Sequence, residues 1–170
     1  KGLRNSLYCP HCATPISNFE VALDAQENYK EVKDAATTYK YKLEGKENTY
    51  ILAWSTTPWN KIVTPALAVN PKITYVKVKP RFAKASRGKQ GEVYILAKST
   101  LKILDEKYEI LEEFKGEKLV GKKFVPHFNY YKIEKDKKAF IIIAGDFVTA
   151  EEGTGVVTIA AYGEEDLKTI

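Results

Sequence analysis

What this chain lacks excludes several chemistries. It has no methionine, only two histidines and two cysteines. No apolar run approaches the roughly 20 residues that a helix needs to cross a bilayer. There is also no HExxH zinc motif, no phosphate-binding glycine loop and no dinucleotide-binding fingerprint. Neither histidine lies near Thr56, Thr57 or Thr154 in the sequence, so nothing local supports a serine-hydrolase type of triad.

The bulk composition fits one globular domain, or one domain with small additions. Of the 170 residues, 44% are hydrophobic and 29% are charged, which is ordinary for a folded chain. The absence of methionine, even at position 1, suggests a piece excised from a larger protein. A processed N-terminus would give the same pattern.

The charge balance leaves two interpretations open. There are 27 Lys and Arg against 22 Asp and Glu, a formal net charge of +5, which a solvated lysine-rich surface explains. The sharper alternative is a surface that meets a polyanion. Its best candidate is the segment 77–89, with six basic residues and no acid, in which Lys84, Arg87 and Lys89 would contact phosphates. The same segment could also be only a long hairpin connection.

The two cysteines form a short CxxC motif at Cys9 and Cys12. Structural zinc is normally held by four ligands, so this is half of a site, with further ligands needed from outside the chain. An inert or oxidised pair is the second interpretation. Redox chemistry is the third, although no thioredoxin-like strand and helix follow the motif.

The hydrophobic pattern predicts many short strands and few helices. The expected strands are residues 38–43, 49–54, 66–69, 73–78, 92–97, 108–114, 140–144, 147–150 and 155–160. Short helical segments are expected at 99–104, within 115–121 and from 163 onward. This pattern favours a mainly β fold, a barrel or strongly curved sheet over residues 36–170, preceded by an arm over residues 1–35 that carries the CxxC motif.

Two segments near opposite ends of the chain combine hydroxyl residues with tight turns. Residues 54–60 read WSTTPWN, and residues 151–158 read EEGTGVVT, with EED at 164–166. Hydroxyl side chains at strand ends, with a carboxylate further along the chain, are typical of a ligand pocket. The adjacent glutamates are poor acid–base pairs because neighbouring side chains tend to point apart. The pocket would therefore hold a small polar cation, and any catalysis would use a positioned water rather than a protein nucleophile.

These motifs resemble the editing insertion of isoleucyl-tRNA synthetase, the connective-peptide domain shared by the isoleucyl, valyl and leucyl enzymes. The family motif WTTTPWTLPSNxALAVNP stands here as WSTTPWNKIVTPALAVNP at 54–71. The second motif, ADFVxxEEGTGIVHxAPxFGxxD, stands as GDFVTAEEGTGVVTIAAYGEED at 145–166. Weaker matches at residues 8–21 and 108–121 extend the resemblance over nearly the whole chain, in family order.

The resemblance implies a β-barrel that hydrolyses the ester of valine wrongly attached to the tRNA for isoleucine. A second site is needed because one methylene distinguishes the two amino acids by only about 1–3 kcal/mol, as is well established for this enzyme family. By position, Asp166 would bind the α-ammonium group, and Ser55, Thr56 and Thr57 would hold the water and the terminal adenosine. Thr57 and Asp166 would be the catalytic pair. Asn60 and Thr158 would also contact the substrate, Thr158 beside the amino-acid side chain.

Partners and cofactors follow from the same resemblance. The tRNA acceptor end, a valine ester and the rest of the parent synthetase would be the partners, in a cytoplasmic, monomeric fragment without membrane contact. The editing reaction would need no cofactor, while Cys9 and Cys12 could hold zinc with ligands from outside the chain.

The chain departs from the family pattern inside the active-site motifs. Thr158 replaces a histidine, Asn60 replaces a threonine, and residues 61–64 replace LPSN. Three interpretations are therefore open. The pocket edits with adapted contacts, it edits a different amino acid, or it has lost editing and only contacts the tRNA acceptor end.

Overall fold

The computed structural model describes residues 6–22, 31–33, 35–81, 91–104, 107–130, 132–151, 153–160 and 164–169. Its strands are β1 (Leu7–Cys9), β2 (Thr14–Ile16), β3 (Thr37–Lys42), β4 (Thr49–Ser55), β5 (Ala66–Val69), β6 (Thr74–Pro80), β7 (Val93–Ala97), β8 (Tyr108–Lys115), β9 (Ile141–Ala144) and β10 (Val156–Ile159). Its helices are α1 (Asn18–Ala22), α3 (Glu164–Thr169) and the 3-10 segments η1 (Pro58–Val63), η2 (Lys98–Ile103) and η3 (Gly116–Lys118).

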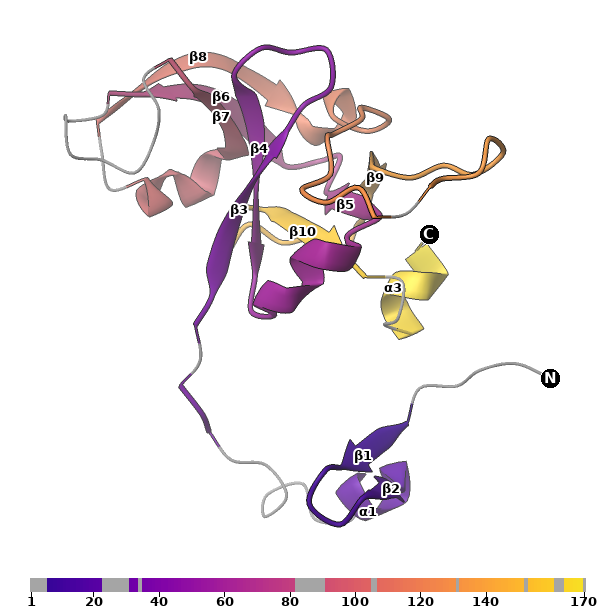
Figure 1. Cartoon of the computed structure of the whole chain (residues 1–170). Helices are drawn as coiled ribbons and strands as arrows, with labels where there is room; N and C mark the ends of the chain where they lie inside the picture. The colour runs from indigo at the N-terminus through magenta and orange to yellow at the C-terminus, as the bar shows by residue number, and fades with distance from the viewer. Residues whose placement is uncertain are drawn as a thin grey trace.

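Strands β3 to β10 form one eight-stranded, strongly curled sheet (Figure 1). Its order is β8–β6–β7–β4–β10–β5–β9, and β3 pairs with the other edge of β4. One edge of β4 is shared: β7 runs parallel to its first half, and β10 meets it at Val157 opposite Trp54. The mainly β barrel expected from the sequence is confirmed.

The segment 121–125 draws the ends of this sheet together. Isolated bridges join Phe124 to Leu43, just after β3, and Lys123 to Ile141 in β9. The Val125 N–H donates to the carbonyl of Lys42 at 2.8 Å. β3, β4, β10, β5 and β9 thus curl around a common interior.

That interior contains the main core. It combines buried aromatic and aliphatic side chains from the inner faces of the strands, namely Tyr39, Tyr41, Leu43, Ile51, Ala53, Leu67, Val69, Tyr75, Ile95, Ala97, Phe114, Leu119, Phe124, Ile142 and Val156. The alternation of inner and outer positions follows from the two-residue period of a strand. The burial of this apolar surface is the principal stabilising contribution.

Residues 7–22 form a separate small unit. β1 and β2 make an antiparallel hairpin, followed by α1, and Figure 1 shows them apart from the sheet. The sequence did not predict this hairpin. The eight-stranded sheet begins at Thr37, while the division of the chain into an arm of residues 1–35 and a barrel of 36–170 stays a prediction. Among the described residues, no helix is long and apolar enough to span a bilayer.

Most expected strands occur within two residues of their expected limits, but the strand expected at 147–150 was wrong. These residues form a turn and coil in which the Val148 N–H donates to the carbonyl of Gly145 at 3.1 Å. The side-chain amide of Asn70 donates to the carbonyls of Asp146 and Val148 at 3.3 and 3.0 Å. Because a side chain satisfies these carbonyls, the segment caps the β5–β6 turn instead of joining a ladder.

A buried tyrosine ties this turn to the start of β10. The Tyr75 hydroxyl donates to the carbonyl of Gly155 at 2.6 Å and accepts from the Asn70 N–H at 3.1 Å, and the side chain is fully buried. Burial raises the pKa of Tyr75 to about 12, so its hydroxyl keeps its proton and remains a donor.

Replacing this tyrosine by phenylalanine should destabilise the fold. Tyr75→Phe leaves a buried N–H and a buried carbonyl without their partner, and we expect the free energy of unfolding to fall by about 1–3 kcal/mol in urea titrations. Tyr108→Phe, on the partly exposed strand β8, is the matched control and should change it by less than about 0.5 kcal/mol. Equal effects of the two substitutions would show that the Tyr75 hydroxyl does not hold the turn.

Candidate functional site

The inner face of the sheet changes from apolar to hydroxyl side chains at one end of three neighbouring strands. The row of inward-facing side chains ends at Ser55 on β4, at Thr158 on β10 and at Thr37 on β3. The next positions inward on the same face are Ala53, Val156 and Tyr39. Thr37 is directly opposite Ser55, and the pairing of Val157 with Trp54 places Thr158 and Ser55 on one face. We call this end of the interior, where the three hydroxyl side chains share one face, the mouth.

Thr158 is the most informative of these side chains. It lies opposite Leu67 of β5 and is only 6% exposed. Its hydroxyl has no hydrogen-bond partner among the residues that the structure describes. Buried polar side chains are nearly always hydrogen-bonded, so this hydroxyl is available to hydrogen-bond a ligand or a water molecule.

Ser55 and Thr57 form a hydrogen-bonded turn where β4 ends. The Ser55 Oγ accepts from the Thr57 N–H at 3.1 Å and lies 3.1 Å from the Thr57 Oγ1. Thr57 precedes η1 as its N-cap residue, and Pro58, which suits a first helical position because it has no N–H, starts the helix. The hydroxyl of Tyr39 donates to the carbonyl of Pro58 at 2.5 Å, and this bond fixes η1 against β3. Thr56, between them, is exposed.

Asp166 brings a carboxylate to the same end of the sheet. It lies on α3, and Figure 1 shows α3 below β5 at the end of β10. The Asp166 Oδ2 accepts from the Ala160 N–H at 3.0 Å, two residues after Thr158. One carboxylate oxygen is thus held by the backbone, and the other has no hydrogen-bond partner among the described residues.

The glycine-rich turn before β10 allows this arrangement. Gly153 and Gly155 have positive φ angles of 64° and 70°, a conformation that L side chains adopt rarely. A Cβ on Gly155 would lie 2.5 Å from the Cβ of Ala97, and one on Gly153 would lie 2.9 Å from that of Trp54. The chain therefore needs glycine here to turn closely between β7 and β4 and enter the sheet as β10.

Several predicted site residues are not placed by the structure. Lys84, Arg87 and Lys89 lie outside the described residues, as does the side chain of Asn60. Glu151 is exposed beside a shallow cavity of about 330 Å³ on the outer face of β4, lined also by Thr38 and Trp54. That cavity opens away from Thr158, because Thr38 and Trp54 point to the opposite face from Thr37 and Ser55.

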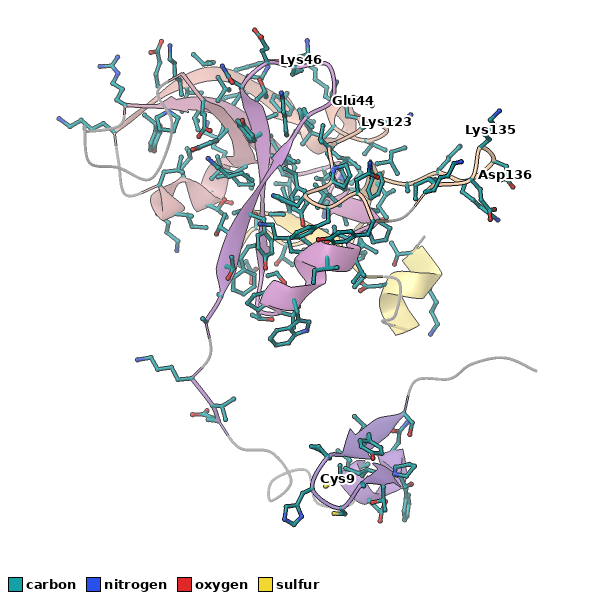
Figure 2. The ribbon with its side chains drawn as sticks, viewed as in Figure 1. Cys9, Glu44, Lys46, Lys123, Lys135 and Asp136 are labelled. Carbon is teal, nitrogen blue, oxygen red and sulfur yellow. The ribbon has the colours of Figure 1, made fainter. Side chains whose placement is uncertain are left out.

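Cys9 and Cys12 lie in the separate β1–β2 unit (Figure 2). Their Sγ atoms are 3.2 Å apart, and the Cys12 N–H donates to the Cys9 Sγ at 3.4 Å. This backbone hydrogen bond lowers the pKa of Cys9, which favours the thiolate form that zinc requires. No group of three His, Cys, Asp or Glu side chains within the described ranges could complete a site.

The arrangement has a definite chemical character. Three neutral hydroxyl side chains share one face at the end of β3, β4 and β10, and the Asp166 carboxylate is hydrogen-bonded to the backbone two residues after Thr158. Such a site suits a ligand that combines an ammonium group with hydroxyl or carbonyl groups. It can orient a water molecule against an activated bond, but it has no basic side chain to make a strong nucleophile of a hydroxyl.

The structure places four of the residues predicted for the site at one end of the sheet, with a fifth, Thr37, that was not predicted. Ser55, Thr57, Thr158 and Asp166 meet at one end of β4 and β10. Thr37 was not predicted, although the alternation of Thr37, Tyr39 and Tyr41 placed it on the inner face of its strand. Only the pairing with Ser55, which the sequence does not show, reveals that this threonine reaches the mouth.

The comparison with known proteins agrees with the geometry. The chain is 46% identical over 167 residues to an isoleucine–tRNA ligase of Clostridium acetobutylicum, a match that covers 98% of this chain and 15% of the relative. A similar enzyme of Bacillus thuringiensis is 43% identical over 172 residues, with 100% and 15% covered. A probable cytoplasmic isoleucine–tRNA ligase of Dictyostelium discoideum is 41% identical over 170 residues, with 98% and 15% covered. No family model matches the chain.

Solved structures show the same fold at low sequence identity. The domain named GlLeuRS-CP1 superposes with a TM-score of 0.57 at 15% identity, covering 73% of this chain and 52% of that one. The editing domain of the P. knowlesi cytosolic leucyl-tRNA synthetase gives a TM-score of 0.57 at 17% identity, covering 74% and 58%.

This chain spans 15% of the length of the curated relatives that it matches, and the match runs through almost every residue of it. Its sheet is that of synthetase editing domains. The chain is therefore homologous, over almost its whole length, to a segment of isoleucine–tRNA ligases, and it has the fold of solved synthetase editing domains.

Proposed function

We propose that this segment hydrolyses the ester bond of valine wrongly attached to the tRNA for isoleucine, within a longer isoleucine–tRNA ligase. The observation that carries the proposal is the mouth formed by Thr37, Ser55 and Thr158 beside the carboxylate of Asp166. An aminoacyl ester offers what such a site binds, namely an ammonium group, a carbonyl and ribose hydroxyls.

Each residue has a role that follows from its position. The free oxygen of Asp166 binds the α-ammonium group, and the backbone bond to Ala160 fixes its direction. Ser55 and Thr57 hold the attacking water through hydroxyl and backbone groups, and Thr56, which is exposed, contacts the terminal adenosine. Thr158, which is buried beside the apolar interior, contacts the amino-acid side chain.

The reaction is hydrolysis by the positioned water. The water oxygen bonds to the ester carbonyl carbon, the bond from that carbon to the ribose oxygen breaks, and the proton lost by the water passes to the ribose oxygen, which leaves as a hydroxyl. The site contributes orientation and hydrogen bonding, since the ester is already an activated bond. Asn60 replaces the family threonine next to this turn, and we include it among the substrate contacts.

Zinc would act away from this chemistry. The adjacent thiols of Cys9 and Cys12, one with a lowered pKa, fit two positions of a tetrahedral site, and the parent protein would supply the other two ligands. The ion would stabilise the β1–β2 unit without entering the ester reaction.

We propose that the partners of this segment are the acceptor end of the tRNA and the remainder of the synthetase. The natural setting is the cytoplasm, as in the name of the Dictyostelium relative. A barrel that contacts the acceptor end without hydrolysis is the alternative, and the departures at Thr158 and Asn60 make it worth testing.

Neutralising the carboxylate should abolish most of the activity. Asp166→Asn keeps the shape but removes the charge that pairs with the ammonium group. A charged hydrogen bond contributes about 1.5–3 kcal/mol, so kcat/KM for valyl-tRNA deacylation should fall about 10- to 150-fold. Asp146→Asn, at an exposed carboxylate, is the matched control. Undiminished deacylation by the Asp166 variant would remove this residue from the site.

The contribution of the Thr158 hydroxyl to deacylation can be measured separately from its contribution to stability. Thr158→Val keeps the volume, so stability should be unchanged or slightly higher, because no protein bond is lost, while deacylation slows about 5- to 10-fold. Thr100→Val is the opposite control: its buried hydroxyl donates to the Ala97 carbonyl at 2.9 Å, so stability should fall and deacylation should not. Loss of stability in Thr158→Val without slower deacylation would contradict the assignment.

Zinc occupancy can be measured on the longer protein. Metal analysis of the purified synthetase should find zinc that is lost when Cys9 and Cys12 are both changed to serine, whereas a Ser6→Ala control beside the motif should retain it. Zinc content that is the same with and without the two cysteines would exclude this half-site.

A further inference from the structure

The short helix η1, which follows the Ser55–Thr57 turn, depends on other elements for its position. The Thr57 side chain stands at the N-cap but makes no capping hydrogen bond. None of the described side chains of η1 is fully buried. A 3-10 helix of this length has little stability of its own. The contacts that β3 makes to η1 therefore decide where the turn before it lies.

Two tyrosines of β3 hold η1 at its two ends. The Tyr39 hydroxyl donates to the carbonyl of Pro58 at 2.5 Å, and the Tyr41 hydroxyl donates to the Oγ1 of Thr64 at 3.3 Å. The two side chains are only 6% and 1% exposed. Burial raises the pKa of each tyrosine, so both hydroxyls keep their protons at pH 7 and remain donors. Each end of the helix is thus fixed by a separate side chain, and either can be removed alone.

Tyr39 is in contact with η1 at a second place. The ammonium group of Lys61 lies 5.4 Å from the centroid of the Tyr39 ring, a distance at which a cation is attracted to an aromatic face. The His127 ring packs against both tyrosines, with centroids 6.2 Å from Tyr39 and 4.5 Å from Tyr41. A hydrogen bond to the backbone of Lys40 fixes this histidine. Tyr39 is therefore held from behind while it holds the helix in front.

Tyr39 also reaches the mouth through Thr37. The two side chains project from the same face of β3, and the Thr37 side chain is hydrogen-bonded to the Tyr39 hydroxyl. A tyrosine hydroxyl has one proton, and a carbonyl oxygen can only accept. Because that proton is given to Pro58, the proton between the two hydroxyls comes from Thr37. Thr37 therefore presents acceptor lone pairs to the mouth and no donor.

An acceptor at this place faces the position proposed for the attacking water. Thr37 is directly opposite Ser55, whose hydroxyl belongs to the turn that holds this water. Thr37 is partly exposed and Tyr39 is buried, so a ligand meets the threonine and not the tyrosine. A water that donates one hydrogen to Thr37 has its orientation restricted, which is the main contribution that a site without a base can make.

We propose that Thr37 accepts a hydrogen bond from the attacking water, and that Tyr39 is the positioning residue that sets the direction of the Thr37 hydroxyl and holds the start of η1. The inference rests on the proposed function, which supplies the water and the ester. Tyr39 acts only through Thr37 and Pro58. Tyr41 makes a similar bond at the other end of η1 and provides the comparison for a purely structural tyrosine.

Steady-state deacylation of valyl-tRNA by the longer synthetase tests both roles. Thr37→Val and Tyr39→Phe should each lower kcat about 3- to 10-fold with KM unchanged, because the orientation of the water is lost and not the binding of the substrate. Thr37→Ser keeps the hydroxyl and should restore kcat. The matched controls are Thr38→Val, at the outward-facing neighbour, and Tyr41→Phe. Both should keep the wild-type kcat, although Tyr41→Phe should lower the midpoint of urea unfolding.

The double variant T37V/Y39F distinguishes a coupled pair from two independent contributions. If Tyr39 acts through Thr37, the double variant should lose no more of kcat than Tyr39→Phe alone. Independent contributions would multiply, to about 10- to 100-fold, and that result would overturn the coupling.

The position of η1 can be measured without catalysis. In the 170-residue chain labelled with 5-fluorotryptophan, Trp54 and Trp59 are the two tryptophans, so Trp59→Phe assigns the fluorine resonances. Tyr39→Phe should shift or broaden the Trp59 resonance, because Trp59 follows Pro58 directly. Tyr41→Phe, at the other end of η1, should change it less. An unchanged Trp59 resonance in Tyr39→Phe would overturn the role of this tyrosine at η1.

The outcomes separate this inference from the proposed function. Wild-type hydrolysis with an unchanged kcat in Thr37→Val or Tyr39→Phe leaves the editing proposal standing and overturns the inference. Equal losses of kcat in the Thr38 and Tyr41 controls would show general damage to the sheet and would overturn it as well. If the wild-type synthetase hydrolyses no ester, the editing proposal fails and the contact of Thr37 with the water fails with it, while the fluorine spectra decide whether Tyr39 holds η1.

Discussion

The insertion of β10 between β4 and β5 is the constraint on which the rest of the molecule depends. β10 lies parallel to the end of β4 at Val157 and antiparallel to all of β5, from Val156 opposite Val69 to Ile159 opposite Ala66. β10, at Val156–Ile159, thus lies between two strands, β4 and β5, that come from residues 49–69. The same pairing unites the two hydroxyl-bearing motifs, which are about a hundred residues apart in the sequence.

The site follows from a small change in this pattern. At one end of three neighbouring strands the inner positions carry the hydroxyls of Thr37, Ser55 and Thr158, where the adjacent inner positions are Tyr39, Ala53 and Val156. Hydroxyls at these places contribute little to the core, and Thr158 remains without a protein partner. A fold that keeps a buried, unpaired hydroxyl loses a little stability in return for a polar mouth, which is common at functional sites.

The sequence predicted strands well and their assembly poorly. The alternation in residues 38–43 and the apolar run at 49–54 gave β3 and β4, because strand periodicity is a local property. The strand expected at 147–150 does not form, because the side-chain amide of Asn70, distant in sequence, donates hydrogen bonds to the carbonyls of Asp146 and Val148. Thr37 was missed for the same reason, since its role depends on lying opposite Ser55. The roles of Thr56, Asn60, Thr158 and Asp166 came from family resemblance, and no pairing of strands could be read from composition.

The charges of the candidate site match the proposed substrate. One carboxylate, held by the backbone beside neutral hydroxyls, suits the ammonium group of an aminoacyl ester.

The most direct test of the account compares release of valine and isoleucine from the tRNA for isoleucine, using this 170-residue chain and the longer synthetase in parallel. The account predicts that valyl-tRNA is hydrolysed and isoleucyl-tRNA is spared, at least by the longer protein, despite the changes at Asn60 and Thr158. Release of neither amino acid by either protein, with the chain shown to be folded, would mean that this barrel keeps the architecture of an editing domain without its chemistry.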